Sequence, residues 1–234
     1  MDKKRKLLGV NLAVLAVFAL LYAALASPAG VMTMAGSVKY PVYRGASDTC
    51  VSIQCSVTWD AAALERILEI LEEQGVSITF GVTADWAKAH PTLLSNMAKS
   101  GHEIAAAAAP GKSRAGYGSL KAETEECALL IERITGERPK LLLCGSEDAE
   151  KSARAARAAG LVPVLSTLDL DCANGSAGEI ESRASSISGG GCIIEAEPTE
   201  SFASALPFLI EKIKNMGFDI VPTHKMLYNN HGGL

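Results

Sequence analysis

The hydrophobic pattern of the chain alternates, from residue 50 onward, between short apolar runs and longer segments with helical spacing. The runs, which are typical of buried strands, cover residues 51–57, 76–82, 102–109, 139–144, 162–168, 192–196 and 218–222. Between the runs, apolar residues recur three and four positions apart, as Leu64, Ile67, Leu68 and Leu71 do, which is the spacing of one helical face. This helical pattern is weaker in residues 180–187. The pattern therefore predicts an α/β domain in which strands and helices alternate.

Glycines punctuate this alternation at the expected ends of the helices. Five of them stand directly ahead of a predicted strand: Gly75, Gly101, Gly136, Gly160 and Gly217. Glycine suits that place because it adopts the left-handed conformation that closes a helix without a Cβ clash. Such regular alternation indicates parallel strands with right-handed crossovers. A parallel sheet of about seven strands either closes into a barrel or stays open with helices on both faces, and the pattern alone favours neither.

A basic cluster and a long apolar run occupy the start of the chain. Residues 3–6 are all Lys or Arg, and the uncharged run 7–26 is about long enough to cross a hydrocarbon core ~30 Å thick. The sequence thus predicts a single-pass membrane protein whose basic cluster lies in the cytoplasm and whose domain is extracytoplasmic. The alternative is a signal peptide cleaved between Ala26 and Ser27, which would make the protein secreted. Residues 1–27 are accordingly assigned to the anchor or signal peptide, 28–49 to a stalk or linker and 50–234 to the domain.

Composition fits this organisation. The 234 residues are 48% hydrophobic with a formal net charge of -4, as expected for one globular domain and a short extra segment. Without the basic cluster and Asp2, 18 basic residues face 25 acidic ones, and a net charge of -7 argues against nucleic acid as a partner. The six cysteines are not spaced as a disulfide framework. Cys55, Cys144 and Cys192 fall in predicted strands, where they are expected to pack as small apolar residues.

Three stretches carry a resemblance to a known family. The order VSIQCSVTWD (51–60), LEEQGVSITFGVTADWAKAHP (71–91) and GHEIAAAAAP (101–110) is similar to the start of the NodB-like polysaccharide deacetylases, and most similar to their sporulation branch. In that branch the first strand ends Thr-Phe-Asp-Ile-Ser-Trp-Gly and the third reads Gly-His-Glu-Ile-Gly-Ser-His, with a second His four residues later. The resemblance spans about residues 51–227 and implies a distorted (β/α) barrel of about seven parallel strands.

The resemblance also implies where the family's chemistry should lie, and this sequence departs from it there. The general-base Asp of the family falls on Ser56, and its metal ligands fall on Val57, Ala107 and Gly111. At the later strand ends, Leu143 replaces an Arg and Glu197 replaces the His that serves as general acid. Asp169 matches a family carboxylate, and Trp59 keeps the Trp of the sporulation pattern. Neither zinc nor another cofactor is expected at a site whose ligand positions carry Val, Ala and Gly.

A rebuilt zinc site remains an alternative. Several possible ligands fall near predicted strand ends: Cys55, Cys144, Glu147, Asp148, Asp169, Asp171, Glu195, Glu197 and His224. No pair of them has a CxxC or HExxH spacing, which would make the assignment specific. The sequence therefore favours an inactive, deacetylase-like protein of the cell envelope that binds a glycan or an envelope protein. An active deacetylase with a rebuilt site and a purely structural role are the other readings.

Overall fold

The computed structural model describes residues 40–58, 63–108, 116–146 and 149–228. The expected anchor at residues 1–27, and with it Trp59, Gly111, Glu147 and Asp148, lies outside this described part. Among the described residues, none of the helices combines the length and the apolar character needed to cross a bilayer.

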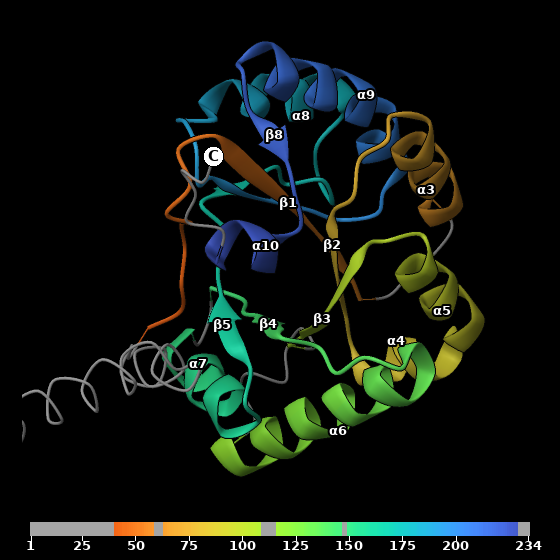
Figure 1. The fold of residues 1–234 in the computed structure, drawn as a ribbon, viewed down its shortest axis with the longest axis vertical. Helices are drawn as coiled ribbons and strands as arrows, with labels where there is room; N and C mark the ends of the chain where they lie inside the picture. Colours follow the sequence, from red (N-terminus) through yellow and green to blue (C-terminus); the bar gives the residue numbers. More distant parts are fainter. Residues whose placement is uncertain (1–39, 59–62, 109–115, 147–148, 229–234) are drawn as a thin grey trace, which may run out of the picture. The chain divides into compact units, whose positions relative to one another are not determined.

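A curved parallel sheet forms the centre of the domain (Figure 1). Its strands are β1 (Cys50–Val57), β2 (Thr79–Val82), β3 (Glu103–Ala107), β4 (Leu141–Leu143), β5 (Val162–Val164), β6 (Leu168–Asp169), β7 (Ile193–Ala196) and β8 (Asp219–Ile220). Seven of them follow the order β5-β4-β3-β2-β1-β7-β6, and β8 pairs with the start of β1. Every pairing is parallel, as the alternation of strands and helices predicts.

Helices cover the outer face of the sheet, and one short helix lies inside its curve (Figure 1). The helices are α3 (Leu64–Glu73), α4 (Ala84–Ala89), α5 (Pro91–Lys99), α6 (Tyr117–Thr135), α7 (Ala149–Ala158), α8 (Ala177–Arg183), α9 (Glu200–Asn215), α10 (Thr223–Tyr228) and the 3-10 turn η2 (Ala184–Ser186). The glycines expected to end helices all have positive φ, for example +84° at Gly136 after α6. Those helix ends are therefore confirmed.

Alternation along the strands separates two hydrophobic clusters. In β1, Val51, Ile53, Cys55 and Val57 belong to the large cluster between sheet and outer helices, while the residues between them carry polar side chains. A second, smaller group, which we call the inner cluster, consists of Ala105, Ala107, Leu141, Leu143, Val164, Ile193 and Met226. Met226 comes from α10, so this helix contributes directly to the inner packing of the curved sheet.

In the described part of the chain the sheet does not close into a barrel, because its two edge strands, β5 and β6, do not pair with each other. The predicted single strand 162–168 is wrong; it is interrupted, and residues 165–167 carry the chain from one edge to the other. Leu165 N donates to Val42 O at 2.8 Å, and Thr167 N donates to Ile193 O at 2.7 Å. These bonds pull successive residues toward different partners, so no continuous ladder forms. The family's barrel is thus present as an open, curled sheet.

Residues 40–49, which the sequence assigned to the linker, pack against the domain. Val42 N donates to Pro163 O at 2.9 Å, and Gly45 N donates to Gly191 O at 2.8 Å. The turn before β7 lies so close that a Cβ atom added to Gly190 would stand 2.4 Å from the backbone of Asp48. The domain therefore begins at least as early as Tyr40, and only the remainder of the expected linker lies outside the described residues.

The hydrophobic pattern does not predict α10. β8 runs beside Cys50 and Val51 only, so its carboxyl end lies beside the first half of β1. The chain then turns into α10, whose start is fixed by polar groups from the beginnings of β2 and β3. Thr223 N donates to Thr79 Oγ1 at 2.8 Å, and His224 N donates to Glu103 Oε2 at 3.0 Å. The helix is thereby held within the curve of the sheet at the amino ends of the strands.

Candidate functional site

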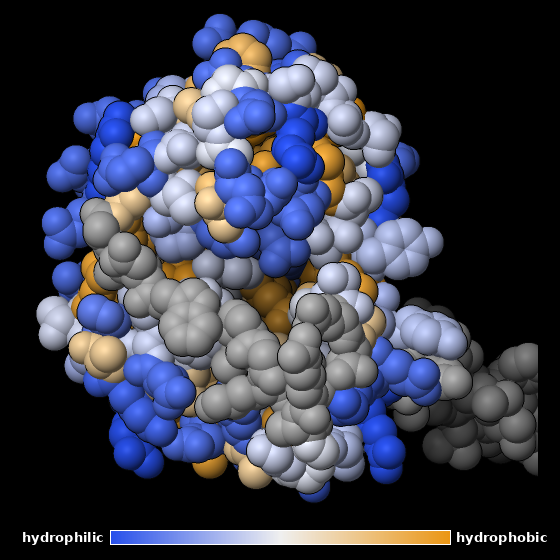
Figure 2. Space-filling model, turned by 180° about the vertical axis from the view of Figure 1, so that it is seen from behind, coloured by the Kyte–Doolittle hydropathy of each residue, from blue (hydrophilic) through white to orange (hydrophobic). Residues whose placement is uncertain are grey.

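The carboxyl ends of parallel strands meet on one face of such a domain, and that is where α/β folds place their ligand sites. Figure 2 shows the domain from behind the view of Figure 1, with a hollow near the middle that has hydrophobic residues on its floor. Above the hollow in this view, the surface is formed mainly by hydrophilic residues. The residues at the ends of β1, β6 and β7 define the chemistry that the described part of this face offers.

Glu195 of β7 is the centre of the polar group at these strand ends. Ser166 Oγ donates to its Oε2 at 2.8 Å, and Ser56 Oγ donates to its Oε1 at 3.3 Å. Burial raises the pKa of the Glu195 carboxyl, and the nearby Asp169 raises it further, whereas the two serine hydrogen bonds lower it. Ser56, at the family's general-base position, therefore serves as a hydrogen-bond donor to a carboxylate from the neighbouring strand.

Glu197 and Asp169 lie beside this group. Glu197 Oε2 accepts a hydrogen bond from Ala173 N at 3.2 Å, and Asp169 Oδ1 accepts one from Asp171 N at 2.7 Å. Burial raises the pKa of Glu197, and the charges of Asp169, Glu195 and Asp171 add to the increase. The structure thus brings together three of the predicted site residues, Ser56, Asp169 and Glu197. With Glu195, the carboxyl groups of Asp169 and Glu197 form a negative rim that accepts hydrogen bonds, and Ser56 donates one to it.

The family's metal site has no counterpart among the described residues. Ala107 and Leu143 are buried in the inner cluster, at 8% and 5% exposure. A Cβ atom placed on Gly81 would stand 2.4 Å from Leu143 Cδ1 and 3.4 Å from Ala107 Cβ, so Leu143 fills the space above Gly81. Val57 packs with the outer cluster at 0% exposure, on the opposite side of β1 from Ser56. Hydrocarbon side chains offer zinc no donor atom, and the residues present do not fit the metal.

The alternative of a rebuilt zinc site finds no group of three or more His, Cys, Asp or Glu side chains in metal-binding proximity among the described residues. Cys144 is buried behind β4 and donates to Leu142 O, and burial raises the pKa of its thiol to about 12. His224 lies at the amino ends of the strands, next to Glu103. That position follows from the short β8, and it corrects the expectation that His224 joins the other candidates.

Sequence reasoning missed two members of the site. Ser166 falls inside a predicted strand, although in the structure it follows β5 and reaches Glu195. Cys172 carries no sequence signal of its own, and it is 2% exposed. Burial raises the pKa of its thiol to about 12, although a hydrogen bond with the backbone of Glu197 acts to lower this pKa. The signal available for Ser166 is the polar pair at 166–167 after an apolar run, which is typical of a strand end rather than a strand interior.

Comparison with known proteins agrees with this architecture. Residues 52–164 match the family model described as Polysaccharide deacetylase. The uncharacterized protein YlxY of Bacillus subtilis (strain 168) is 28% identical over 183 residues, an alignment that covers 76% of this chain and 57% of YlxY. The chain therefore spans less than two thirds of the length of this relative.

Solved structures with similar folds include wild-type BA3943 of Bacillus anthracis, described as a CE4 family pseudoenzyme. It has a TM-score of 0.76 and 22% identity, over 81% of this chain and 69% of that one. A mutant of BA3943 with restored enzymatic activity has a TM-score of 0.76 and 21% identity, over 81% and 72% of the two chains. The peptidoglycan deacetylase PdaC of Bacillus subtilis has a TM-score of 0.69 and 20% identity, over 77% and 90%.

At these identities the solved structures establish only a common fold, and the match to the family model rests on the sequence of residues 52–164. The open curled sheet, the parallel pairing and the position of the strand-end residues all agree with that assignment. The resemblance carried by the sequence is therefore confirmed, and residues 52–164 belong to the polysaccharide deacetylase family.

Proposed function

We propose that this chain is a catalytically inactive, deacetylase-like protein of the cell envelope that binds a glycan at the carboxyl-end face of its sheet. The observation that carries the proposal is the packing of Leu143 over Gly81 and against Ala107. The family positions for a metal-binding His and an Arg are occupied there by side chains that stabilise each other as hydrocarbon core. Metal-assisted amide hydrolysis needs a Lewis acid and a base at that place. The described residues there supply neither ligands for a metal nor a base.

The comparisons support the same proposal. BA3943 shares the fold and is described as a pseudoenzyme, and PdaC shares it and acts on peptidoglycan. A fold that retains its strand-end hollow but not its metal ligands retains the part suited to binding. In this proposal residues 1–27 anchor the protein in the membrane, so the glycan is one that lies outside the cytoplasm. The negative rim around Glu195 and Glu197 contributes hydrogen-bond acceptors for sugar hydroxyls.

An active deacetylase with a rebuilt site is the competing proposal. Glu195 and Glu197 favour it, because a carboxyl whose pKa is raised by burial is suited to general acid or base catalysis. Cys55, a candidate nucleophile nearby, counts against it, because this residue is 0% exposed in the large hydrophobic cluster and burial raises the pKa of its thiol, which keeps the thiol protonated.

The two proposals are separated by one experiment on the purified full-length protein. Zinc content after dialysis, deacetylation of N-acetylated chito-oligosaccharides and binding of the same oligosaccharides are measured side by side. We expect no zinc above that of an unrelated control protein, no acetate release, an unchanged melting temperature with chelator, and saturable binding. Stoichiometric zinc or acetate release would reject the inactive assignment. Absence of glycan binding would reject the glycan and leave an envelope protein as the partner to be tested.

A further inference from the structure

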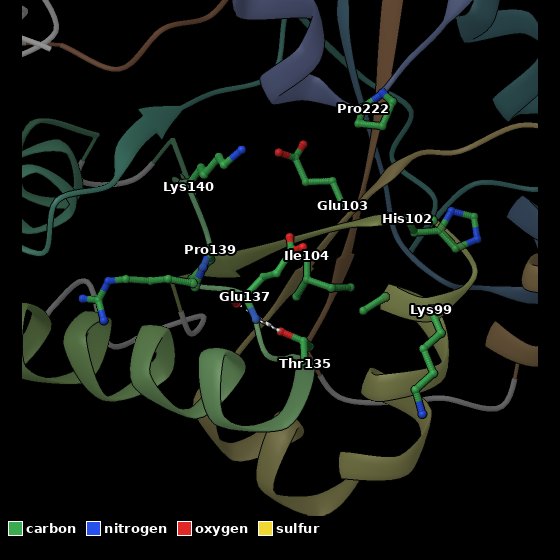
Figure 3. Close-up of a pocket in the computed structure, with 12 residues that line it drawn as sticks. Lys99, His102, Glu103, Ile104, Thr135, Glu137, Pro139, Lys140 and Pro222 are labelled. Carbon is green, nitrogen blue, oxygen red and sulfur yellow. Dashed lines mark hydrogen bonds between the residues drawn. The ribbon is translucent and has the colours of Figure 1, made fainter. Parts of the chain in front are cut away.

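A separate pocket lies at the amino ends of β3 and β4, at the opposite end of the strands from the hollow at their carboxyl ends. It has a volume of about 310 Å³, and the ends of α5 and α6 and the residue before α10, Pro222, contribute to its lining. Figure 3 shows Glu103 and Lys140 extending into it from the starts of the two strands. This location makes the pocket independent of the proposed function.

Glu103 offers the pocket a carboxylate that is only partly satisfied by the protein. The hydrogen bonds from Thr79 Oγ1, at 2.7 Å, and from His224 N, at 3.0 Å, both end on Oε2. Oε1 is therefore the oxygen left for a ligand. Burial raises the pKa of Glu103, whereas these hydrogen bonds and the charge of Lys140 lower it. A half-buried carboxylate in this state gains from a cation placed at its second oxygen.

Lys140 supplies the opposite charge across the pocket. Figure 3 shows its amine directed toward the Glu103 carboxylate. The two do not form an ion pair within 4 Å, since the ion pairs between described residues do not include them. The other cations of the lining are directed elsewhere. Arg138 forms ion pairs through Nη2 with Glu125 Oε1 at 2.9 Å and through Nη1 with Glu132 Oε2 at 3.2 Å. The side chain of Lys99 points away from the pocket (Figure 3).

Charge and size restrict what can bind between Glu103 and Lys140. A simple anion at Lys140 is repelled by Glu103 and by Glu137, the second carboxylate of the lining, a simple cation at Glu103 is repelled by Lys140, and a neutral molecule compensates neither charge. The volume of about 310 Å³ stands at the lower end of the ~300–1,000 Å³ typical of small-molecule sites, so the ligand is small. We propose that this pocket binds a small zwitterion of the amino-acid class, with its ammonium group at Glu103 and its carboxylate at Lys140.

Isothermal titration calorimetry of the full-length protein tests this assignment. Alanine and 4-aminobutyrate carry both charges at two separations, while acetate, ethylamine and glycerol each lack at least one. We expect saturable binding of at least one zwitterion and at least about tenfold weaker binding of all three analogues, because each loses a charge-assisted hydrogen bond. Glu103→Gln and Lys140→Gln should each reduce the affinity for the zwitterion by about tenfold or more.

A charge-matched control pair, Glu69→Gln and Lys121→Gln, changes exposed helix residues outside the pocket lining and should leave the affinity unchanged. Glu103→Gln also alters the hydrogen bond that Glu103 accepts at the start of α10, and this variant could fail to fold. The side chain of Lys140 is exposed, so Lys140→Gln keeps the test valid in that case. Binding of acetate or ethylamine as tight as that of the zwitterion overturns the proposal. So does zwitterion binding that Lys140→Gln leaves intact, or the absence of saturable binding by both zwitterions.

Discussion

At the scale of single residues, the contact between Gly81 and Leu143 is the feature most specific to this chain. A Cβ atom at Gly81 would stand 2.4 Å from Leu143 Cδ1. Gly81→Ala should therefore destabilise the protein by about 1–3 kcal/mol through overpacking. Leu143→Ala should cost about 2–5 kcal/mol through the cavity it leaves. In the Leu143→Ala background the cost of Gly81→Ala should nearly vanish, and urea unfolding of the four proteins measures this coupling.

Gly118→Ala is the matched control, because a Cβ atom on Gly118 meets nothing within 4 Å inside α6. This variant should be neutral or more stable by up to about 1 kcal/mol. If Gly81→Ala costs as much in the Leu143→Ala background as it does in the wild type, the side chain of Leu143 does not fill the space above Gly81. The basis for the proposed loss of the metal site would then be gone.

Glu195 should make stability depend on pH in a defined direction. Because folding raises its pKa above the ordinary 4.5, the folded protein holds this proton more tightly than the unfolded chain does. Its stabilising contribution is complete below pH 4.5 and is lost as pH rises through the raised pKa. Glu195→Gln, which resembles the protonated form, should therefore gain more stability over the wild type at about pH 7.5 than at about pH 5. Urea midpoints at the two pH values measure the difference.

Ser166→Ala provides the second arm of this test. It removes one of the two serine hydrogen bonds that lower the pKa of Glu195, so the fall in stability between about pH 5 and about pH 7.5 should become steeper. Equal gains for Glu195→Gln at both pH values would mean that Glu195 is not desolvated in the folded protein.

At the scale of elements, α10 shows how strongly a short helix can depend on its environment. Met226 is 1% exposed and packs with residues of β3, β4, β5 and β7, whereas the adjacent Lys225 is exposed. Met226→Ala should reduce the free energy of unfolding by about 2–5 kcal/mol, and Lys225→Ala should change it by less than about 0.5 kcal/mol. Similar effects for the two variants would show that α10 does not occupy the inside of the sheet.

The elements that the sequence could predict are those with a local signal. The helical spacing around Leu64 and the glycine after α6 each specify a helix or its end within a few residues. The sequence could not predict α10, because six residues hold too few periodic positions and its start depends on Glu103, about 120 residues earlier.

Strand ends and site contacts were harder still. The break between β5 and β6 depends on bonds from Leu165 to Val42 and from Thr167 to Ile193, which no local pattern records. Resemblance to a family drew attention to Ser56, Asp169 and Glu197, but the partner of Ser56 became visible only with the neighbouring strand in place. Strand alternation places the adjacent Ser56 and Val57 on opposite faces of the sheet, and the structure shows that Val57 is buried in the large hydrophobic cluster.

At the scale of the whole molecule, the basic cluster and apolar run at the start of the chain predict membrane attachment. The protein should sediment with membranes and resist extraction by carbonate, because a spanning segment of about 20 residues is buried in hydrocarbon. Protease added to intact cells after removal of the wall should degrade the domain. A domain that is degraded only after permeabilisation would place it on the cytoplasmic side, and recovery in the culture medium would indicate cleavage near Ala26.

The bonds between Val42 and β5 have a consequence for self-association. Without them, Pro163 O and Leu165 N would face outward at a bare sheet edge, which is a template for strand addition by a second molecule. A version that begins at Cys50 should form dimers or larger aggregates, while one that begins at Val38 should stay monomeric at the same concentration. Light scattering coupled to gel filtration compares them. If this holds, the segment that tethers the domain also shields it, and proteolysis between Gly45 and Cys50 would release a protein prone to aggregate.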